Sequence, residues 1–263
     1  MASFLDQLNP AQREAVTTVD GPVMIVAGAG SGKTRVLTYR SAYLIAQGKR
    51  PESIFAVTFT NKAAQEMKER IIALVGPESR SIWMGTFHSM FARILRFECE
   101  HLGYERNFSI YDTDDSLQMV KSIMNSLNIS LQQYPPQGIR SRISAAKNQM
   151  ISAKAFKSSS ADPLMERTAL VYEEYEKRLK KNNAMDFDDL LLKPLELFRK
   201  HKEVLERYQW RFRSLMVDEY QDTNRVQYSL MKELASLGRN ICVVGDDAQS
   251  IYGFRGADIR NIL

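Results

Sequence analysis

A glycine-rich loop gives the first indication of chemistry in this chain. The segment IVAGAGSGKT (25–34) places the loop directly after a strand-like apolar run and before a helical stretch. In such a loop the glycines let successive backbone N–H groups point at phosphate oxygens, and the following helix adds the positive end of its dipole. We expect Lys33 to reach the β and γ phosphates of a nucleotide and Thr34 to hold Mg²⁺. A glycine-rich turn with a chance Gly-Lys-Thr is the structural alternative.

The loop departs from the usual eight-residue pattern at its first position, which is Ala27 instead of glycine. Gly28, Gly30 and Gly32 remain, so the loop keeps the conformational freedom that glycine provides. We expect the preceding strand to run one residue further.

A pair of acids follows another apolar run. The segment SLMVDEYQD (214–222) carries Asp218 and Glu219 at the expected end of a strand. Asp218 is expected to coordinate Mg²⁺, and Glu219 to polarise an attacking water, which indicates a hydrolase. Acids at strand ends also cap helices or stay solvated, and that is the alternative for this pair.

The elements that must position these residues follow from short apolar runs rich in branched side chains. Such runs predict the strands of a mostly parallel, buried sheet, at 22–27, 54–59, 81–85, 214–218 and 240–246. Helices are expected near 33–47 and 61–75, because parallel strands need long crossovers. Helical periodicity predominates from about 89 to 211, and no strand is predicted there. The sequence thus predicts an α/β domain over 1–88 and 212–263, interrupted by an all-helical insertion over 89–211.

Composition narrows the class of protein. The 263 residues are 44% hydrophobic, enough for one large domain or two modest ones with cores of their own. No apolar run is long enough for a membrane helix and the amino terminus lacks signal-peptide features, so we expect a cytoplasmic protein without a membrane partner. Cys99 and Cys242 are far apart and are expected to be buried filler.

The net charge of +5 is unevenly distributed. Residues 116–161 contain no acid, and their basic residues are Lys121, Arg140, Arg142, Lys147, Lys154 and Lys157. A polyanion could bind this region, and a solvated basic face is the alternative. Arg140, Arg142 and Lys147 are the candidates for a grip on duplex DNA.

With these residues identified, the chain closely resembles the superfamily 1 DNA helicases of the UvrD/PcrA/Rep type. The resemblance covers essentially the whole chain and implies a RecA-like P-loop NTPase fold that uses ATP and Mg²⁺. It rests on seven segments in order: LNPAQREAV (8–16), AGAGSGKTRVL (27–37), TFTNKAA (58–64), GTFHS (85–89), DFDDLL (186–191), VDEYQDTN (217–224) and VGDDAQSIYGFRGAD (244–258). The three acids of DFDDLL suggest metal ligands, but a helix start explains them better.

The resemblance also implies roles for single residues at the nucleotide. Gln12 matches the residue that reads the adenine edge, Arg35 matches a nucleotide-contacting position, and Gln249 matches the sensor that links the γ phosphate to the DNA track. The rest of the ATP site is the loop itself, Gly28, Ala29, Gly30, Ser31 and Gly32.

A groove for single-stranded DNA is implied by the same resemblance. Its matching residues are Phe59, Asn61, Thr86, His88, Tyr252, Phe254 and Arg255. Aromatic faces suit a sequence-neutral motor, because any base can stack on them for ~1–3 kcal/mol. Phe254 replaces the family's more usual tryptophan and offers a smaller platform. Without the resemblance, Phe59 would be read as core and His88 as a structural histidine.

As a whole, the resemblance implies the first motor domain of an ATP-dependent 3′ to 5′ helicase that acts on single-stranded and junction DNA in repair or replication, with accessory proteins. The second RecA-like domain, which supplies arginine fingers in such helicases, lies outside this sequence. The chain alone is therefore expected to bind Mg-ATP weakly and to hydrolyse it barely. A helicase–nuclease subunit and a short, non-catalytic ATP- and DNA-binding module are the alternatives.

Overall fold

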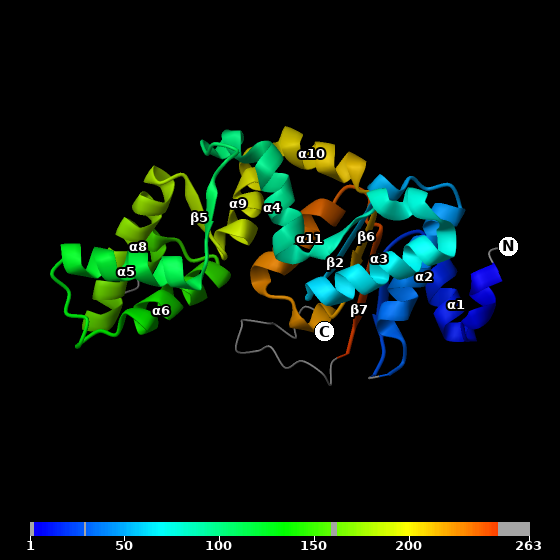
Figure 1. The fold of residues 1–263 in the computed structure, drawn as a ribbon, viewed down its shortest axis with the longest axis horizontal. Coiled ribbons are helices and arrows are strands. Elements are labelled where there is room, and N and C mark those ends of the chain that lie inside the picture. Colours follow the sequence, from blue (N-terminus) through cyan, green and yellow to red (C-terminus); the bar gives the residue numbers. More distant parts are fainter. Residues whose placement is uncertain (1–2, 29, 159–161, 247–263) are drawn as a thin grey trace. The chain divides into compact units, whose positions relative to one another are not determined.

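The computed structural model describes residues 3–28, 30–158 and 162–246, and the chain forms two compact units (Figure 1). The first unit comprises Met1–Met90 and Phe198–Leu263, and the second comprises Phe91–Leu197. The sequence places the insertion at 89–211. The structure instead assigns helix α10 (Lys202–Arg211) to the first unit.

A five-stranded parallel sheet forms the centre of the first unit, with the order β1-β7-β6-β2-β3. Each predicted strand is present, but β1 ends at Val26 and does not extend to Ala27 as predicted. Their bounds are β1 Val23–Val26, β2 Ile54–Thr58, β3 Trp83–Thr86, β6 Ser214–Val217 and β7 Ile241–Gly245. In this order, β7 separates the strand before the glycine-rich loop from the strand before the acid pair. Since all five strands run in one direction, their carboxyl ends share one edge of the sheet.

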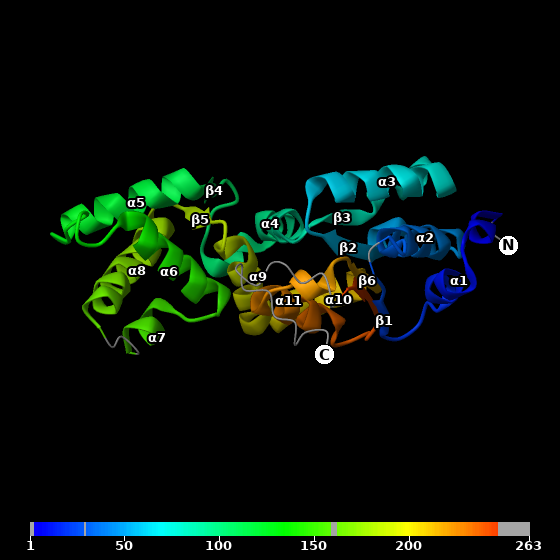
Figure 2. The same cartoon turned by 90° about the horizontal axis from the view of Figure 1, so that it is seen from below.

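Helices cover both faces of this sheet (Figure 2). On one face lie the two predicted helices, α2 (Lys33–Ala46) and α3 (Asn61–Val75), whose Leu37 and Ile71 pack with the strand residues Ala56 and Val244. On the other face Phe212, directly after α10, contacts Phe55 and Trp83 with ring centroids 4.8 and 5.1 Å away. Helix α11 (Arg225–Ala235) contacts α10 on that side.

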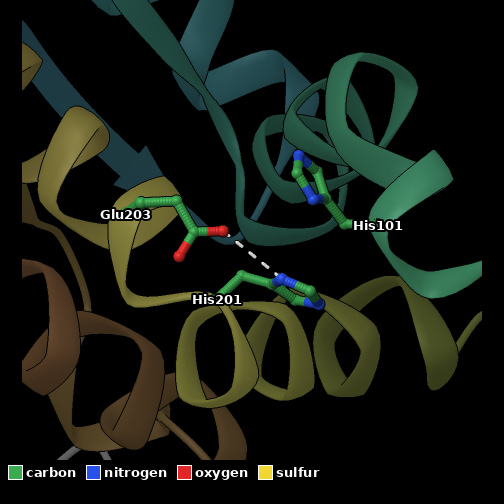
Figure 3. A group of neighbouring side chains, drawn as sticks. All are labelled: His101, His201 and Glu203. Atoms are coloured by element: carbon green, nitrogen blue, oxygen red, sulfur yellow. Dashed lines mark ion pairs between the residues drawn. The ribbon is translucent and has the colours of Figure 1, made fainter.

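Local signals explain where several helices of this unit begin. Asn9 caps α1 (Pro10–Thr17) through a capping box with Gln12. Helix α10 starts after His201, whose Nδ1 lies 3.4 Å from the Glu203 Oε1 in the first turn (Figure 3). The unit also contains the first turn of α4 (Phe87–Glu98) and the end of α9 (Asp189–Lys200). Its described 3-10 turns are η1 Ser3–Gln7, η2 Pro51–Ser53, η3 Pro77–Ser81 and η5 Tyr220–Asp222.

The second unit is mostly helical and has its own core. Its elements are η4 Cys99–Leu102, α5 Thr113–Ser126, α6 Pro136–Asn148, α7 Ala153–Ser158 and α8 Pro163–Lys181, with the remainder of α4 and α9. Ile123, Ile143 and Val171 belong to a buried cluster between α5, α6 and α8. The expectation of a strand-free insertion needs one correction: β4 (Ser109–Tyr111) and β5 (Ala184–Asp186) form a short parallel pair. Three residues are too few for a period-2 pattern to stand out.

Two bulk expectations can be compared with this fold. Cys99 and Cys242 are both buried and neither forms a disulfide, as predicted. Within the described ranges, no helix combines the length and the hydropathy that crossing a lipid bilayer requires.

Candidate nucleotide and nucleic-acid site

The glycine-rich loop leaves the carboxyl end of β1 and leads directly into α2, which begins at Lys33. Gly30 and Gly32 have φ angles of 74° and 84°, in the left-handed region that disfavours side chains. A Cβ on Gly32 would also lie 2.9 Å from the Gln12 Nε2. The backbone conformation therefore requires glycine at position 32, and a side chain there would also displace the Gln12 amide.

Thr34 and Asp218 come together at the base of this loop. The Thr34 hydroxyl donates to the Asp218 Oδ2 at 3.1 Å, and the Glu219 N–H donates to the Asp218 Oδ1 at 3.1 Å. Asp218 is 1% exposed, and its burial, together with the charge of Glu219, raises the pKa of Asp218 to about 6. A hydroxyl beside a carboxylate is an oxygen donor set that suits Mg²⁺, so these residues fit the expected ion.

Lys33 forms a buried ion pair with a residue that the sequence analysis did not single out. Its Nζ lies 3.1 Å from the Asp246 Oδ2, and both side chains are buried. Asp246 directly follows β7, so it stands at the same sheet edge as the loop and the acid pair. Asp246 could have been identified from the sequence by the same signal as Asp218, because each is an acid at the end of a predicted strand.

Glu219 has a backbone conformation that is unusual for a residue with a side chain. Its φ and ψ are 48° and 47°, in the left-handed region, which costs about 1–2 kcal/mol for such residues. The Gln221 Nε2 donates to its Oε2 at 2.8 Å, and the Gln221 Oε1 accepts from the Asp246 N–H at 3.0 Å. Hydrogen bonds thus connect Glu219 to Asp246, the partner of Lys33.

Two residues that resemblance assigns to the nucleotide flank the loop. The Gln12 Nε2 donates to the Ser31 carbonyl at 2.9 Å, and its Oε1 accepts from the Asn9 N–H at 3.2 Å. The Arg35 Nη2 donates to the Gln7 carbonyl at 2.9 Å. Both therefore connect the amino-terminal segment to the loop or to α2. Ala29 and Gln249 lie outside the described residues.

The described DNA candidates lie at the carboxyl ends of β2 and β3, at the other side of the same edge. The half-buried Phe59 has its ring centroid 5.8 Å from that of Phe87, and Asn61 is exposed at the start of α3. The Thr86 Oγ1 accepts from the Ser89 N–H at 3.2 Å. Burial lowers the pKa of His88 to about 4, so at neutral pH its imidazole is uncharged. Tyr252, Phe254 and Arg255 lie outside the described residues.

Lys147 corrects the interpretation of the basic segment. It is 1% exposed, and its Nζ lies 2.8 Å from Glu176, 2.8 Å from Asp186 and 3.0 Å from Asp189. Burial alone would lower the pKa of Lys147, but the three carboxylates raise it well above its ordinary value. Lys147 is therefore inaccessible to DNA, whereas Arg142 is exposed and Arg140 is partly buried.

The same cluster shows what the DFDDLL segment does. The Asp189 N–H donates to the Asp186 Oδ1 at 2.8 Å where α9 begins, so these acids start a helix as predicted. One lysine cannot balance three acids, and burial followed by the charge of Asp186 raises the pKa of Asp189 to about 7. A cavity of about 30 Å³ beside the cluster has room for a water and not for a nucleotide.

Comparison with known proteins agrees with this geometry. The profile of the family described as UvrD/REP helicase N-terminal domain matches residues 8–263. The chain is 51% identical to the ATP-dependent DNA helicase PcrA of Bacillus subtilis (strain 168) over 261 residues, which cover 99% of this chain and 35% of that protein. It is 48% identical to the ATP-dependent DNA helicase PcrA of Staphylococcus aureus (strain Mu50) over 264 residues, which cover 100% of this chain and 36% of that protein. The chain thus spans little more than a third of the length of these curated relatives.

Proposed function

This chain belongs to the UvrD/REP helicase N-terminal domain family, and on that basis we propose that it is the first motor domain of an ATP-dependent DNA helicase. The observation that carries the proposal is the 3.1 Å hydrogen bond between Thr34 and Asp218. It joins the glycine-rich loop to the acid pair across 184 positions of sequence, as a site for a magnesium nucleotide requires.

In this proposal each described residue has a distinct task. The loop N–H groups and Lys33 bind the triphosphate, and Lys33 exchanges the carboxylate of Asp246 for phosphate oxygens. Thr34 and Asp218 would hold Mg²⁺, which when bound offsets the negative charge of the phosphates. Glu219 accepts a proton from the attacking water as the terminal P–O bond breaks. Gln12 and Arg35 position the loop and contribute to ATP binding.

The arrangement of the sheet supports the DNA track that the resemblance implies. Phe59, Asn61, Thr86 and His88 lie at the ends of β2 and β3, and the nucleotide residues lie at the ends of β1, β7 and β6. Two ligands at one sheet edge would be coupled by small movements of the loops between them. Translocation from 3′ to 5′, a second RecA-like domain in the same protein, a cytoplasmic location and a role in repair or replication complete the proposal.

Replacing Lys33 in the full-length protein tests this function. We expect Lys33→Ala to reduce DNA-stimulated ATP hydrolysis by about 100-fold or more, because it removes the charge that stabilises the phosphates in the transition state. Lys49→Ala, at an exposed position just after α2, is the matched control and should leave the rate unchanged. Hydrolysis that survives Lys33→Ala would contradict the proposal.

A further inference from the structure

Gln221 joins two parts of the candidate site that lie on different strands. It belongs to the turn η5 after β6 and is 1% exposed. Its side chain reaches Glu219 with one polar atom, at 2.8 Å, and the backbone of Asp246 with the other, at 3.0 Å. Through the ion pair of Asp246 with Lys33, a single amide therefore lies between the water-polarising carboxylate and the phosphate-binding lysine.

The chemistry of the two contacts fixes the amide in one orientation. A carboxylate can only accept a hydrogen bond, and a backbone N–H can only donate one. The –NH₂ group must therefore face Glu219 and the carbonyl oxygen must face Asp246. A glutamate of the same size would place a second carboxylate beside Glu219, and a leucine would leave the buried Asp246 N–H without its acceptor.

Glu219 needs such support because its own backbone does not hold it in a favourable conformation. It is in the left-handed region, and its amide N–H is already directed to the Asp218 Oδ1. Its side chain is only partly buried, so packing alone leaves the carboxylate several rotamers. The hydrogen bond from Gln221 selects one of them.

We infer that Gln221 is a positioning residue for ATP hydrolysis, which holds the Glu219 carboxylate at a fixed place relative to Lys33 without contacting the nucleotide itself. This inference rests on the proposed function. A fixed position matters because a displacement of about 1 Å at the reacting groups costs about 100-fold in rate. Gln221 should accordingly affect turnover and not nucleotide affinity.

The test compares two buried glutamines of the full-length protein. Gln227 is 6% exposed, and its Oε1, like that of Gln221, accepts from a backbone N–H. That N–H belongs to Asn224, so Gln227 serves the cap of α11. We expect Gln221→Leu to lower the kcat for ATP by about 10-fold or more, with the KM for ATP and the affinity for a non-hydrolysable ATP analogue within about twofold of the parent. Gln227→Leu should lower the melting temperature and leave kcat unchanged.

Gln221→Glu provides a second variant for the test in case Gln221→Leu does not fold. An ionised glutamate at this position has no N–H to donate to Glu219, so the kcat for ATP should fall by about 10-fold or more while the KM stays within about twofold of the parent. A kcat of both Gln221 variants that matches the parent, or an equal fall in kcat in Gln227→Leu, would overturn the inference.

ATP hydrolysis by the parent protein and by Lys33→Ala distinguishes a failure of the proposed function from a failure of this inference. If the parent hydrolyses ATP in a Lys33-dependent manner while the Gln221 variants behave normally, only the inference fails. If Lys33→Ala changes neither nucleotide binding nor hydrolysis, the proposed function fails and the inference fails with it.

Discussion

Asp218 illustrates how burial prepares a side chain for a ligand at the expense of stability. The pKa of an unfolded aspartate is near 3.9, and that of Asp218 in the folded chain is raised to about 6. Between these pH values the folded chain retains a proton that the unfolded chain has released. The free energy of unfolding therefore falls as the pH rises through this window. A cation beside the carboxylate would offset this cost.

Asp218→Asn should consequently stabilise the protein while it impairs the site. At pH 7.5 we expect the free energy of unfolding to rise by about 3 kcal/mol, because the pKa of Asp218 lies about two units above that of an unfolded aspartate and each unit is worth about 1.4 kcal/mol. Near pH 4 the gain should largely disappear, since the aspartate is then protonated in the folded chain. Urea unfolding at both pH values measures this difference, and binding of a fluorescent nucleotide with Mg²⁺ should weaken. A variant no more stable than the parent at pH 7.5 would contradict this account.

Lys147 has the opposite role, because it stabilises the second unit and is inaccessible to ligands. Three carboxylates surround its ammonium group within 3.0 Å. Lys147→Met keeps the apolar stem and removes the charge, leaving buried acids uncompensated. We expect a loss of about 3–5 kcal/mol at pH 7 and a smaller loss at pH 5, where the acids bind protons more readily.

Urea unfolding of that unit measures the loss, with Lys154→Met at an exposed position of the same basic segment as the control. The control should change the free energy of unfolding by no more than about 0.5 kcal/mol. Equal effects of the two substitutions would show that the buried cluster is not stabilising.

At the scale of elements, the parallel sheet determines where ligands can bind. The strand order places the ends of β1, β7 and β6 side by side, and β2 and β3 follow on the same edge. Loops at these ends carry the candidate phosphate-binding residues on one side and the DNA candidates on the other. Ligands in open α/β sheets bind outside the carboxyl ends of the strands, in agreement with this division.

Phe59 provides a test of the DNA side of the edge. Phe59→Ala should weaken binding of an oligothymidylate to the full-length protein by about 1–3 kcal/mol, the value of one stacked base. Trp210→Ala is a matched aromatic control, because Trp210 is 65% exposed on α10 and stacks with Arg213. Fluorescence anisotropy measures both. If only the tryptophan substitution weakens binding, the track lies elsewhere.

At the scale of the whole molecule, two compact units imply two separable stabilities. Each has its own buried clusters, exemplified by Ile71 with Val244 in the first and Ile143 with Val171 in the second. The nucleotide residues all belong to the first unit, and the Lys147 cluster belongs to the second. A ligand stabilises only the unit that binds it.

Calorimetry should therefore resolve two unfolding transitions in this chain. Mg-ADP at about 100 times its dissociation constant should stabilise the first unit by about 2.7 kcal/mol and raise only its transition. Lys147→Met should lower only the other transition. A single transition whose temperature shifts both with Mg-ADP and with Lys147→Met would show that the two units unfold together.

The strands, the first helices and the glycine-rich loop were all predictable from the sequence. Apolar runs, capping residues and glycine spacing act over a few neighbouring positions, so Lys33, Thr34 and the acid pair could be recognised from local patterns. The roles of Gln12 and of the DNA candidates came from resemblance. The short strands β4 and β5 were missed because three residues carry almost no periodic signal.

Only the tertiary structure decided which distant residues meet. The insertion of β7 between β1 and β6 brings Asp246 to Lys33 across 213 positions and gives Gln221 its second partner. Lys147 appears as one of several basic residues in a segment without acids, yet the fold buries it among acids from α8, β5 and α9. The charges along a sequence do not show which side chains are accessible, because accessibility depends on which helices pack together. Strand order and helix packing arise from long-range contacts, which local patterns do not encode.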